Sequence, residues 1–106
     1  MKKMIFVGSK DGSKVSVKLN GKELESRPIY IGLKRKEPKF EWGANSGAGA
    51  SDLSSAILNQ VLGSENVTLK MISAFKWQFI SNIRGNNWIV EGKQVEKWCQ
   101  KFLRNQ

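Results

Sequence analysis

The stretch FEWGANSGAGAS, Phe40–Ser51, divides the chain into two halves with different hydrophobic periods. In the first half apolar and polar residues alternate, as in a half-buried strand, and in the second half apolar residues recur every three or four positions, as in an amphipathic helix. Within the stretch, Trp42-Gly43 opens a run of small residues that permit a sharp change of chain direction. The sequence therefore predicts an α+β fold in which Phe40–Ser51 leads from N-terminal strands into a helix capped by Ala50 or Ser51.

The first 25 residues carry the signals of an antiparallel β-meander. Met4–Val7 is a short apolar run, and Val15–Leu19 alternates apolar with polar residues. Asp11-Gly12 and Asn20-Gly21 are dipeptides that favour tight hairpin turns, because their backbones tolerate positive φ. Lys22–Leu24 is predicted to pair back as a brief third strand, which gives the meander one polar face rich in lysine.

Three helices are predicted after the small-residue stretch. The first runs from Ser51 to a closing glycine, Gly63, and the second is capped by Ser64 with Glu65 in its first turn. The last begins at Glu91-Gly92. Their apolar faces are formed in turn by Leu53, Ala56, Ile57, Val61 and Leu62, by Ile72, Phe75, Phe79 and Ile83, and by Val95, Trp98, Cys99, Phe102 and Leu103.

Two segments leave alternatives open. Lys76–Ser81 fits the stripe of the second helix, yet Trp77 and Phe79 also alternate as they would in a strand; the helix is favoured because its stripe is longer. Trp88–Val90 is predicted to be a short strand or an extended link. We expect the N-terminal β-meander to pack against about three helices, with a core anchored by Trp42, Phe75, Phe79, Trp88, Trp98 and Phe102.

The composition limits the chemistry available to the chain. A length of 106 residues corresponds to a single domain with one core. There is no histidine and one cysteine, Cys99, so Ser-His-Asp and Cys-His catalysis are excluded within the chain and no internal disulfide can form. The acidic residues are scattered without the spacing of metal ligands. We therefore predict a protein that is not an enzyme and uses no metal or cofactor.

The net charge of +9 is unevenly distributed. Residues 1–39 hold eleven Lys and Arg against four Asp and Glu, which gives +7, whereas residues 40–106 hold seven against five, which gives +2. A basic half indicates a polyanionic or acidic partner, although such charge can also serve solubility alone. The predicted contacts to nucleic acid or to an acidic partner are Lys10, Lys14, Lys18, Lys34, Arg35, Lys36 and Lys39.

The small residues Gly47–Ser51 precede a predicted helix, whose free N–H groups could hold an anion. A P-loop needs GxxxxGK[ST], and no lysine follows here. The fingerprint GxGxxG fails as well, because Asp52 occupies the place of the last glycine and puts a negative charge near the expected helix start. The stretch therefore predicts close packing of the chain more strongly than nucleotide binding.

Two adjacent residues of the second helix are further candidates. Trp77 lies off the apolar stripe beside Lys70 and Arg84, where it would form a stacking platform for bases; the alternative is that it packs under the meander. Lys76 falls within the stripe, and Glu41 is the carboxylate expected to pair with it. We predict that a Glu41–Lys76 pair is structural and fixes the loop onto the helix.

The N-terminus, MKKMIFVGSK, has two lysines before an apolar run of four residues, which is too short for a signal peptide. No segment approaches the roughly 18 apolar residues of a membrane span. We therefore expect a cytoplasmic protein that does not contact a membrane.

Several motifs together resemble an uncharacterised family of small bacterial and phage proteins. The motifs are FEWG, the small-residue loop, DLSSAIL, AFKWQFI and NNWIVEGKQVEKWCQKFL, so the resemblance covers residues 39–103. Two departures are Ala44, where the family has tyrosine, and Ala50, where it has proline. The matching positions are Phe40, Glu41, Trp42, Gly43, Gly47, Gly49, Leu53, Ile57, Leu58, Phe75, Lys76, Trp88, Val95 and Trp98.

The resemblance implies a setting and no activity: accessory genes of phages and other mobile elements, whose products often bind host or defence components. We therefore predict a small basic accessory protein that engages an acidic host protein or nucleoprotein complex, for example as an inhibitor of a defence system. The alternative is a direct nucleic-acid-binding domain without sequence specificity, whose lysines contact phosphates. An edge strand near Pro28 would also permit a dimer.

Overall fold

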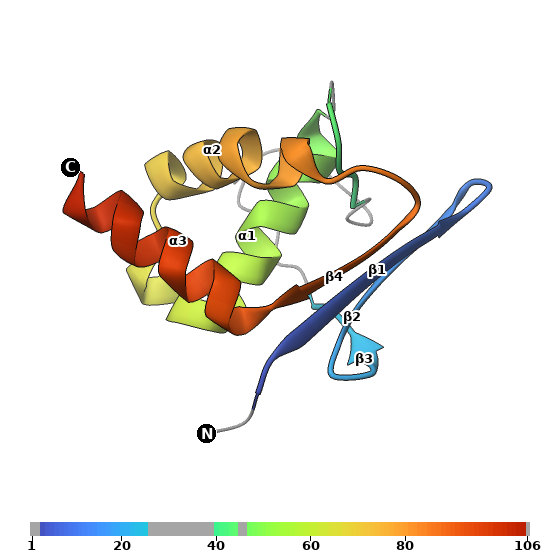
Figure 1. The fold of residues 1–106 in the computed structure, drawn as a ribbon, viewed down its shortest axis with the longest axis horizontal. Helices are drawn as coiled ribbons and strands as arrows, with labels where there is room; N and C mark the ends of the chain where they lie inside the picture. The colour runs from blue at the N-terminus through green and yellow to red at the C-terminus, as the bar shows by residue number, and fades with distance from the viewer. Residues whose placement is uncertain (1–2, 26–39, 45–46, 106) are drawn as a thin grey trace.

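The computed structural model describes residues 3–25, 40–44 and 47–105 and confirms the α+β architecture, with the helices gathered on one side of an antiparallel sheet (Figure 1). In the described part of the chain, no helix is long and apolar enough to cross a membrane. The elements are β1 (Ile5–Asp11), β2 (Lys14–Leu19), β3 (Lys22–Glu23), α1 (Ala48–Leu62), the short 3₁₀ turn η1 (Ser64–Asn66), α2 (Leu69–Gln78), the 3₁₀ turn η2 (Ile80–Asn82), β4 (Asn87–Glu91) and α3 (Gly92–Arg104).

The sheet has the strand order β3-β2-β1-β4, with every neighbouring pair antiparallel. The predicted meander forms, and its second turn uses the two positive φ values that a tight hairpin requires, 51° at Asn20 and 85° at Gly21. The segment around Trp88 is a strand, and it pairs with β1 rather than remaining a link. Gly8 lies between Val17 on one side and Trp88 on the other.

The two faces of the sheet differ because successive side chains point to opposite sides. Toward the helices, Phe6, Val17 and Val90 are buried in the core. On the outer face, Val7 pairs with Ile89 of β4 and with Lys18 of β2, and all three are exposed. The pleat thus separates an apolar inner face from a mixed outer face.

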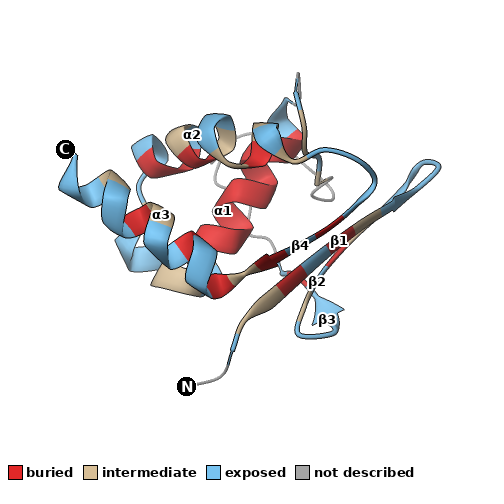
Figure 2. Ribbon diagram, in the orientation of Figure 1, coloured by how far each residue is buried: buried red, intermediate tan, exposed pale blue. Residues whose placement is uncertain are grey.

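The central helix, α1, is buried almost all round, because it lies beneath α2 and α3 (Figures 1 and 2). Ten consecutive residues from Gly49 to Leu58 are buried, including the polar Ser54 and Ser55. The Ser54 hydroxyl donates a hydrogen bond to the Ala50 carbonyl oxygen at 2.7 Å, which satisfies it inside the core. The small side chains of this segment allow the neighbouring elements to approach closely.

Two predicted helix starts are wrong. The first helix begins at Ala48 with Gly47 as its N-cap and without a side-chain cap, so Ala50 and Ser51 lie inside it and Asp52 is beyond its first turn. The small residues before Ser51 therefore extend the helix instead of preceding it.

The second helix also starts later than predicted. Ser64 begins only the turn η1, and the chain is extended at Val67 before α2 starts at Leu69. Thr68 supplies the cap, since its hydroxyl accepts a hydrogen bond from the Met71 N–H at 3.2 Å. The helical interpretation of 76–81 is confirmed, because α2 runs to Gln78 and the turn η2 follows.

The last helix begins at Gly92 as predicted, and the Gln94 side chain accepts a hydrogen bond from the Glu91 N–H at 2.8 Å, as in a capping box. Val95 and Cys99 are buried, as predicted. Leu103 was also predicted to lie on the apolar face, but it is 56% exposed and lies outside the core. The predicted aromatic anchors all contact the core: Phe75 and Trp88 are buried, and Trp42, Phe79, Trp98 and Phe102 are partly buried against it.

Candidate functional site

The FEWG motif fixes the loop before α1 onto the connection between α2 and β4. The Trp42 indole N–H donates to the Gly85 carbonyl oxygen at 2.9 Å, and the Gly43 N–H donates to the Ile80 carbonyl oxygen at 3.0 Å. The Trp42 ring also meets Trp88 edge-on, with centroids 5.5 Å apart. The motif is therefore a structural anchor, and a shallow hollow beside it brings Lys10 and Arg84 near one another.

The predicted Glu41–Lys76 pair does not form. Within the described ranges, Glu41 is exposed and makes no ion pair with Lys76, while an ion pair joins Lys3 to Glu91 at 3.4 Å. The Lys76 ammonium lies over the Trp77 ring instead, 4.9 Å from its centroid. The adjacent aromatic ring thus takes the place of the carboxylate as the partner of this half-buried lysine.

Trp77 is 59% exposed at the end of α2, so the alternative in which it packs under the meander is wrong. Lys70 is exposed seven residues earlier, which places it on the same side of the helix. Arg84 is exposed beyond the end of η2. The exposed aromatic ring that a stacking platform needs is therefore present, and its binding role stays a prediction.

The predicted lysines of the β1–β2 hairpin are exposed but do not share one surface. Lys14 and Lys18 project from the outer face of the sheet, whereas Lys10 is in register with Val15 and projects from the opposite face. Lys18 also lies opposite Glu23 of β3, which offsets part of its charge. The predicted basic-loop residues Lys34, Arg35, Lys36 and Lys39, and the predicted edge near Pro28, lie outside the described residues.

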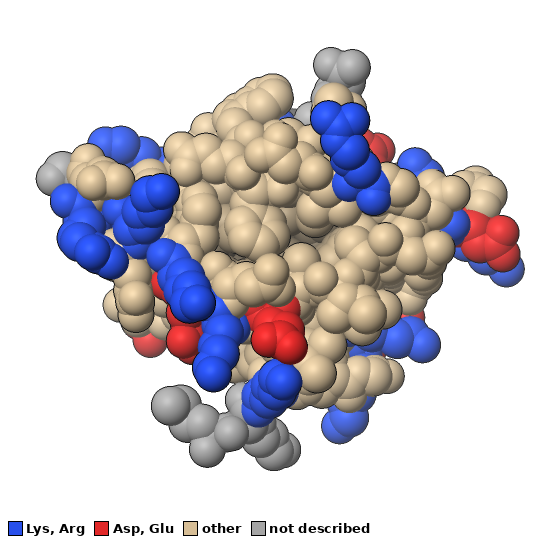
Figure 3. All heavy atoms as spheres, viewed as in Figure 1, with Lys and Arg blue, Asp and Glu red and all other residues tan. Residues whose placement is uncertain are grey.

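A second basic surface lies on α3 and was not among the predicted sites. Lys93, Lys97, Lys101 and Arg104 are all exposed, and at 3.6 residues per turn they fall within about 80° of the helix circumference. We call these four residues the basic stripe. Figure 3 shows Lys and Arg side chains gathered at the end of the molecule that α3 forms. Glu96 lies on α3 outside this arc.

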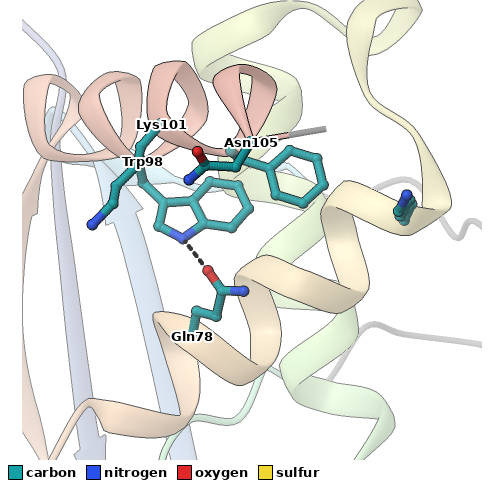
Figure 4. Close-up of a pocket in the computed structure, with 6 residues that line it drawn as sticks. Gln78, Trp98, Lys101 and Asn105 are labelled. Carbon is teal, nitrogen blue, oxygen red and sulfur yellow. Dashed lines mark hydrogen bonds between the residues drawn. The ribbon is translucent and has the colours of Figure 1, made fainter.

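A groove between α2 and α3 adjoins the basic stripe (Figure 4). Its volume is about 390 Å³. The Trp98 indole N–H donates to the Gln78 side-chain oxygen at 3.1 Å across it. The rings of Trp98 and Phe102 stack, with centroids 5.1 Å apart. This α2–α3 groove is lined by Lys70, Gln78, Trp98, Lys101, Phe102 and Asn105.

The sequence contained a signal for this surface, because the four cations of the stripe recur at four- and three-residue spacing. The predicted contacts were instead placed in residues 1–39, because the excess of Lys and Arg is largest there. A helical projection of the last helix separates these cations from the apolar face and from Glu96. The position of Lys70 across a groove depends on how α2 packs on α3, which the sequence alone does not give.

Two buried groups that can ionise, Cys99 and Asp52, lie on different helices, α3 and α1. Cys99 is buried, and desolvation followed by the nearby Glu96 carboxylate raises its pKa to about 11, so the thiol stays protonated at neutral pH. Asp52 is also buried, with a 3% exposed side chain on α1. Among the described residues, no group of three or more Cys, Asp and Glu side chains could hold a metal ion.

The model of a family of unknown function, DUF6166, matches residues 6–101, which includes the FEWG motif, the three helices apart from the end of α3, and most of the sheet. No curated protein and no solved structure matches the chain.

Proposed function

Since the chain belongs to the DUF6166 family, whose function is unknown, we propose from its surfaces that it is a non-enzymatic protein that binds an acidic protein or nucleoprotein complex. The observation that carries this proposal is the outer face of the sheet. There Ile89, 68% exposed, and Val7, 40% exposed, form an apolar centre, with Lys18 beside Val7 in the same cross-strand row. An apolar centre with a charged rim is the usual composition of a protein-binding surface.

The charges around this centre define the partner. Lys14 and Lys18 lie on the outer face, and Asp11 and Glu23 are their cross-strand neighbours. The rim therefore carries both signs, and its lysines can meet acidic groups of a partner, because complementary charges raise the association rate. The net charge of +9 acts in the same direction over longer distances.

A role without catalysis is supported by the side-chain inventory. The whole chain has no histidine, and its one cysteine, Cys99, is buried as a thiol. We propose the biological setting by analogy, from the family resemblance. In this setting the chain is an accessory protein of a phage or mobile element and acts in the cytoplasm on a host complex such as a defence system.

The proposal can be tested by substitutions on the outer face of the sheet. We expect the tagged protein to capture a partner from a nuclease-treated bacterial lysate, and expect Lys14→Glu/Lys18→Glu and Ile89→Asp each to weaken the purified interaction at least about tenfold, the effect of about 1.4 kcal/mol. Lys97→Glu/Lys101→Glu changes the net charge equally and serves as the control for a purified protein partner that is free of nucleic acid. A partner that binds the sheet variants as tightly as the parent protein would contradict the proposal.

A second candidate function is direct binding of nucleic acid without sequence specificity. The specific observation in its favour is Trp77, which is exposed and has the Lys76 ammonium over its ring. Aromatic stacking and phosphate contacts are the two components of such binding.

A further inference from the structure

The basic stripe places positive charge at regular intervals. Successive members from Lys93 to Lys101 are four residues apart, which corresponds to about 6 Å along the helix axis, and the whole stripe spans about 16 Å. A regular row of like charge complements a polymer whose own charges repeat regularly, as phosphates do along a nucleic-acid strand. The outer sheet face is different, because its cations Lys14 and Lys18 lie opposite the acidic residues Asp11 and Glu23.

The α2–α3 groove adds groups that suit a nucleotide rather than a bare anion. Gln78 and Asn105 carry amide groups that can donate to and accept from base edges, and Trp98 and Phe102 provide apolar ring surface. Lys70 and Lys101 lie on the two helices that border the groove. The volume of about 390 Å³ is near the lower end of small-molecule sites, so the groove suits a short part of a strand.

Trp77 extends this surface along α2. It lies about 10 Å from Lys70 along the helix axis and on the same side. Trp77 is 59% exposed, and the Lys76 ammonium is 4.9 Å from the centroid of its ring. A base stacked on this ring would place its phosphate close to a cation, which is the combination found in proteins that bind single strands.

We propose that the α2–α3 side of the molecule is a binding site for single-stranded nucleic acid, in which the basic stripe contacts phosphates and Trp77 stacks on a base. This site rests on the second candidate function, and it contains none of the seven lysines and arginines predicted from the sequence to contact phosphates. An unpaired strand is required because the bases of a duplex are stacked on one another and cannot reach Trp77. The helices lie on one side of the sheet (Figure 1), and the outer face of the sheet points away from them, so this site and the outer sheet face lie on different sides of the molecule.

The site can be tested by fluorescence anisotropy with labelled dT and U oligomers of about 20 nucleotides and with a DNA duplex of the same length. If the stripe makes four phosphate contacts, log K against log salt has a slope of about −2.8, and affinity falls about 50-fold between about 50 and 200 mM salt. Lys97→Gln/Lys101→Gln removes two contacts and should reduce the slope to about −1.4.

Two further sets of variants distinguish binding at this site from a general effect of net charge. Lys14→Gln/Lys18→Gln removes the same two charges from the sheet and should leave the slope near that of the parent protein. Trp77→Ala should weaken binding of the single strand about 5- to 150-fold, while Trp77→Phe retains part of the affinity. Trp77 is exposed, so these variants are expected to fold, and circular dichroism verifies it.

The outcomes are distinct. Binding that depends on the stripe and on Trp77 supports the site. Binding that is weakened by the sheet variant and not by the stripe variant would overturn the site while leaving nucleic-acid binding as a function. Equal affinity for the duplex with no effect of Trp77→Ala would overturn the single-strand proposal, and no binding of any oligomer at about 50 mM salt would overturn both the site and the second candidate function.

Discussion

A single methyl group added at Gly8 should disrupt the contact between the sheet and the aromatic core. Gly8 is in register with Trp88, and an added Cβ would lie 2.1 Å from Trp88 Cε2 and 2.2 Å from Nε1. These are ring atoms of a side chain that is only 8% exposed, so they cannot move aside cheaply. Gly8→Ala must therefore displace the indole ring or bend β1.

The expected loss of stability has two parts: overpacking of the core and loss of a contact between two tryptophan rings. Overpacking in a core costs about 1–3 kcal/mol. Displacing Trp88 also disturbs its edge-on contact with Trp42, with centroids 5.5 Å apart, and such pairs contribute about 0.5–1.5 kcal/mol. We expect Gly8→Ala to lower the free energy of unfolding by about 1.5–4.5 kcal/mol, out of the roughly 5–15 kcal/mol that is typical of a domain.

The assay is urea unfolding followed by tryptophan fluorescence and circular dichroism, with thermal unfolding as a second measurement. A loss of about 2 kcal/mol should lower Tm by roughly 8–16 °C. The control is the same substitution in a Trp88→Leu background, because leucine lacks the indole atoms that Cβ would meet. A cost of less than about 0.5 kcal/mol, the range of a neutral surface change, would contradict a clash between Cβ and the indole ring. An equal cost with Leu or Trp at position 88 would contradict it as well.

Two further predictions concern the helices. Burial raises the pKa of Cys99 to about 11, so the folded state holds the thiol proton more tightly than the unfolded chain does. The protonated thiol therefore contributes to the stability of the folded state, fully below about pH 9 and progressively less as the pH rises towards 11. Urea midpoints measured between pH 8 and 11 should therefore fall more steeply for the parent protein than for Cys99→Ala, and parallel curves would contradict this. Thr68→Ala should cost about 1 kcal/mol, since it removes the cap on the Met71 N–H. Ser64→Ala is the matched control, because the Ser64 hydroxyl caps no helix, and equal losses in the two variants would show that the cap is unimportant.

Local signals predicted the parts of the fold that depend on neighbouring residues. Asn20-Gly21 specified a hairpin turn because the two positive φ values that it needs are accessible to these residues. The last helix was predicted to begin at its observed start because a strongly amphipathic pattern follows Glu91-Gly92. The aromatic anchors were predicted because large rings are seldom left in water.

The parts that were not predicted depend on contacts between distant segments. The start of α1 was placed too late because alanine and glycine fit a loop or a helix, and packing against the other helices decides between them. The partner of Lys76 depended on the position of Glu41, which no local pattern gives. Trp77 was predicted only as one of two alternatives, since its exposure is set by whether the meander reaches it.

The position of β4 beside β1 has a consequence for how the protein is made. Asn87, where β4 begins, follows Asp11, where β1 ends, by 76 residues. At about 5–20 residues per second, synthesis of the intervening chain takes about 4–15 s. During that time β1 can pair with β2 alone, and its other edge has no strand to pair with. The nascent hairpin therefore has a period of several seconds in which a chaperone can bind it or a neighbouring chain can add to its edge.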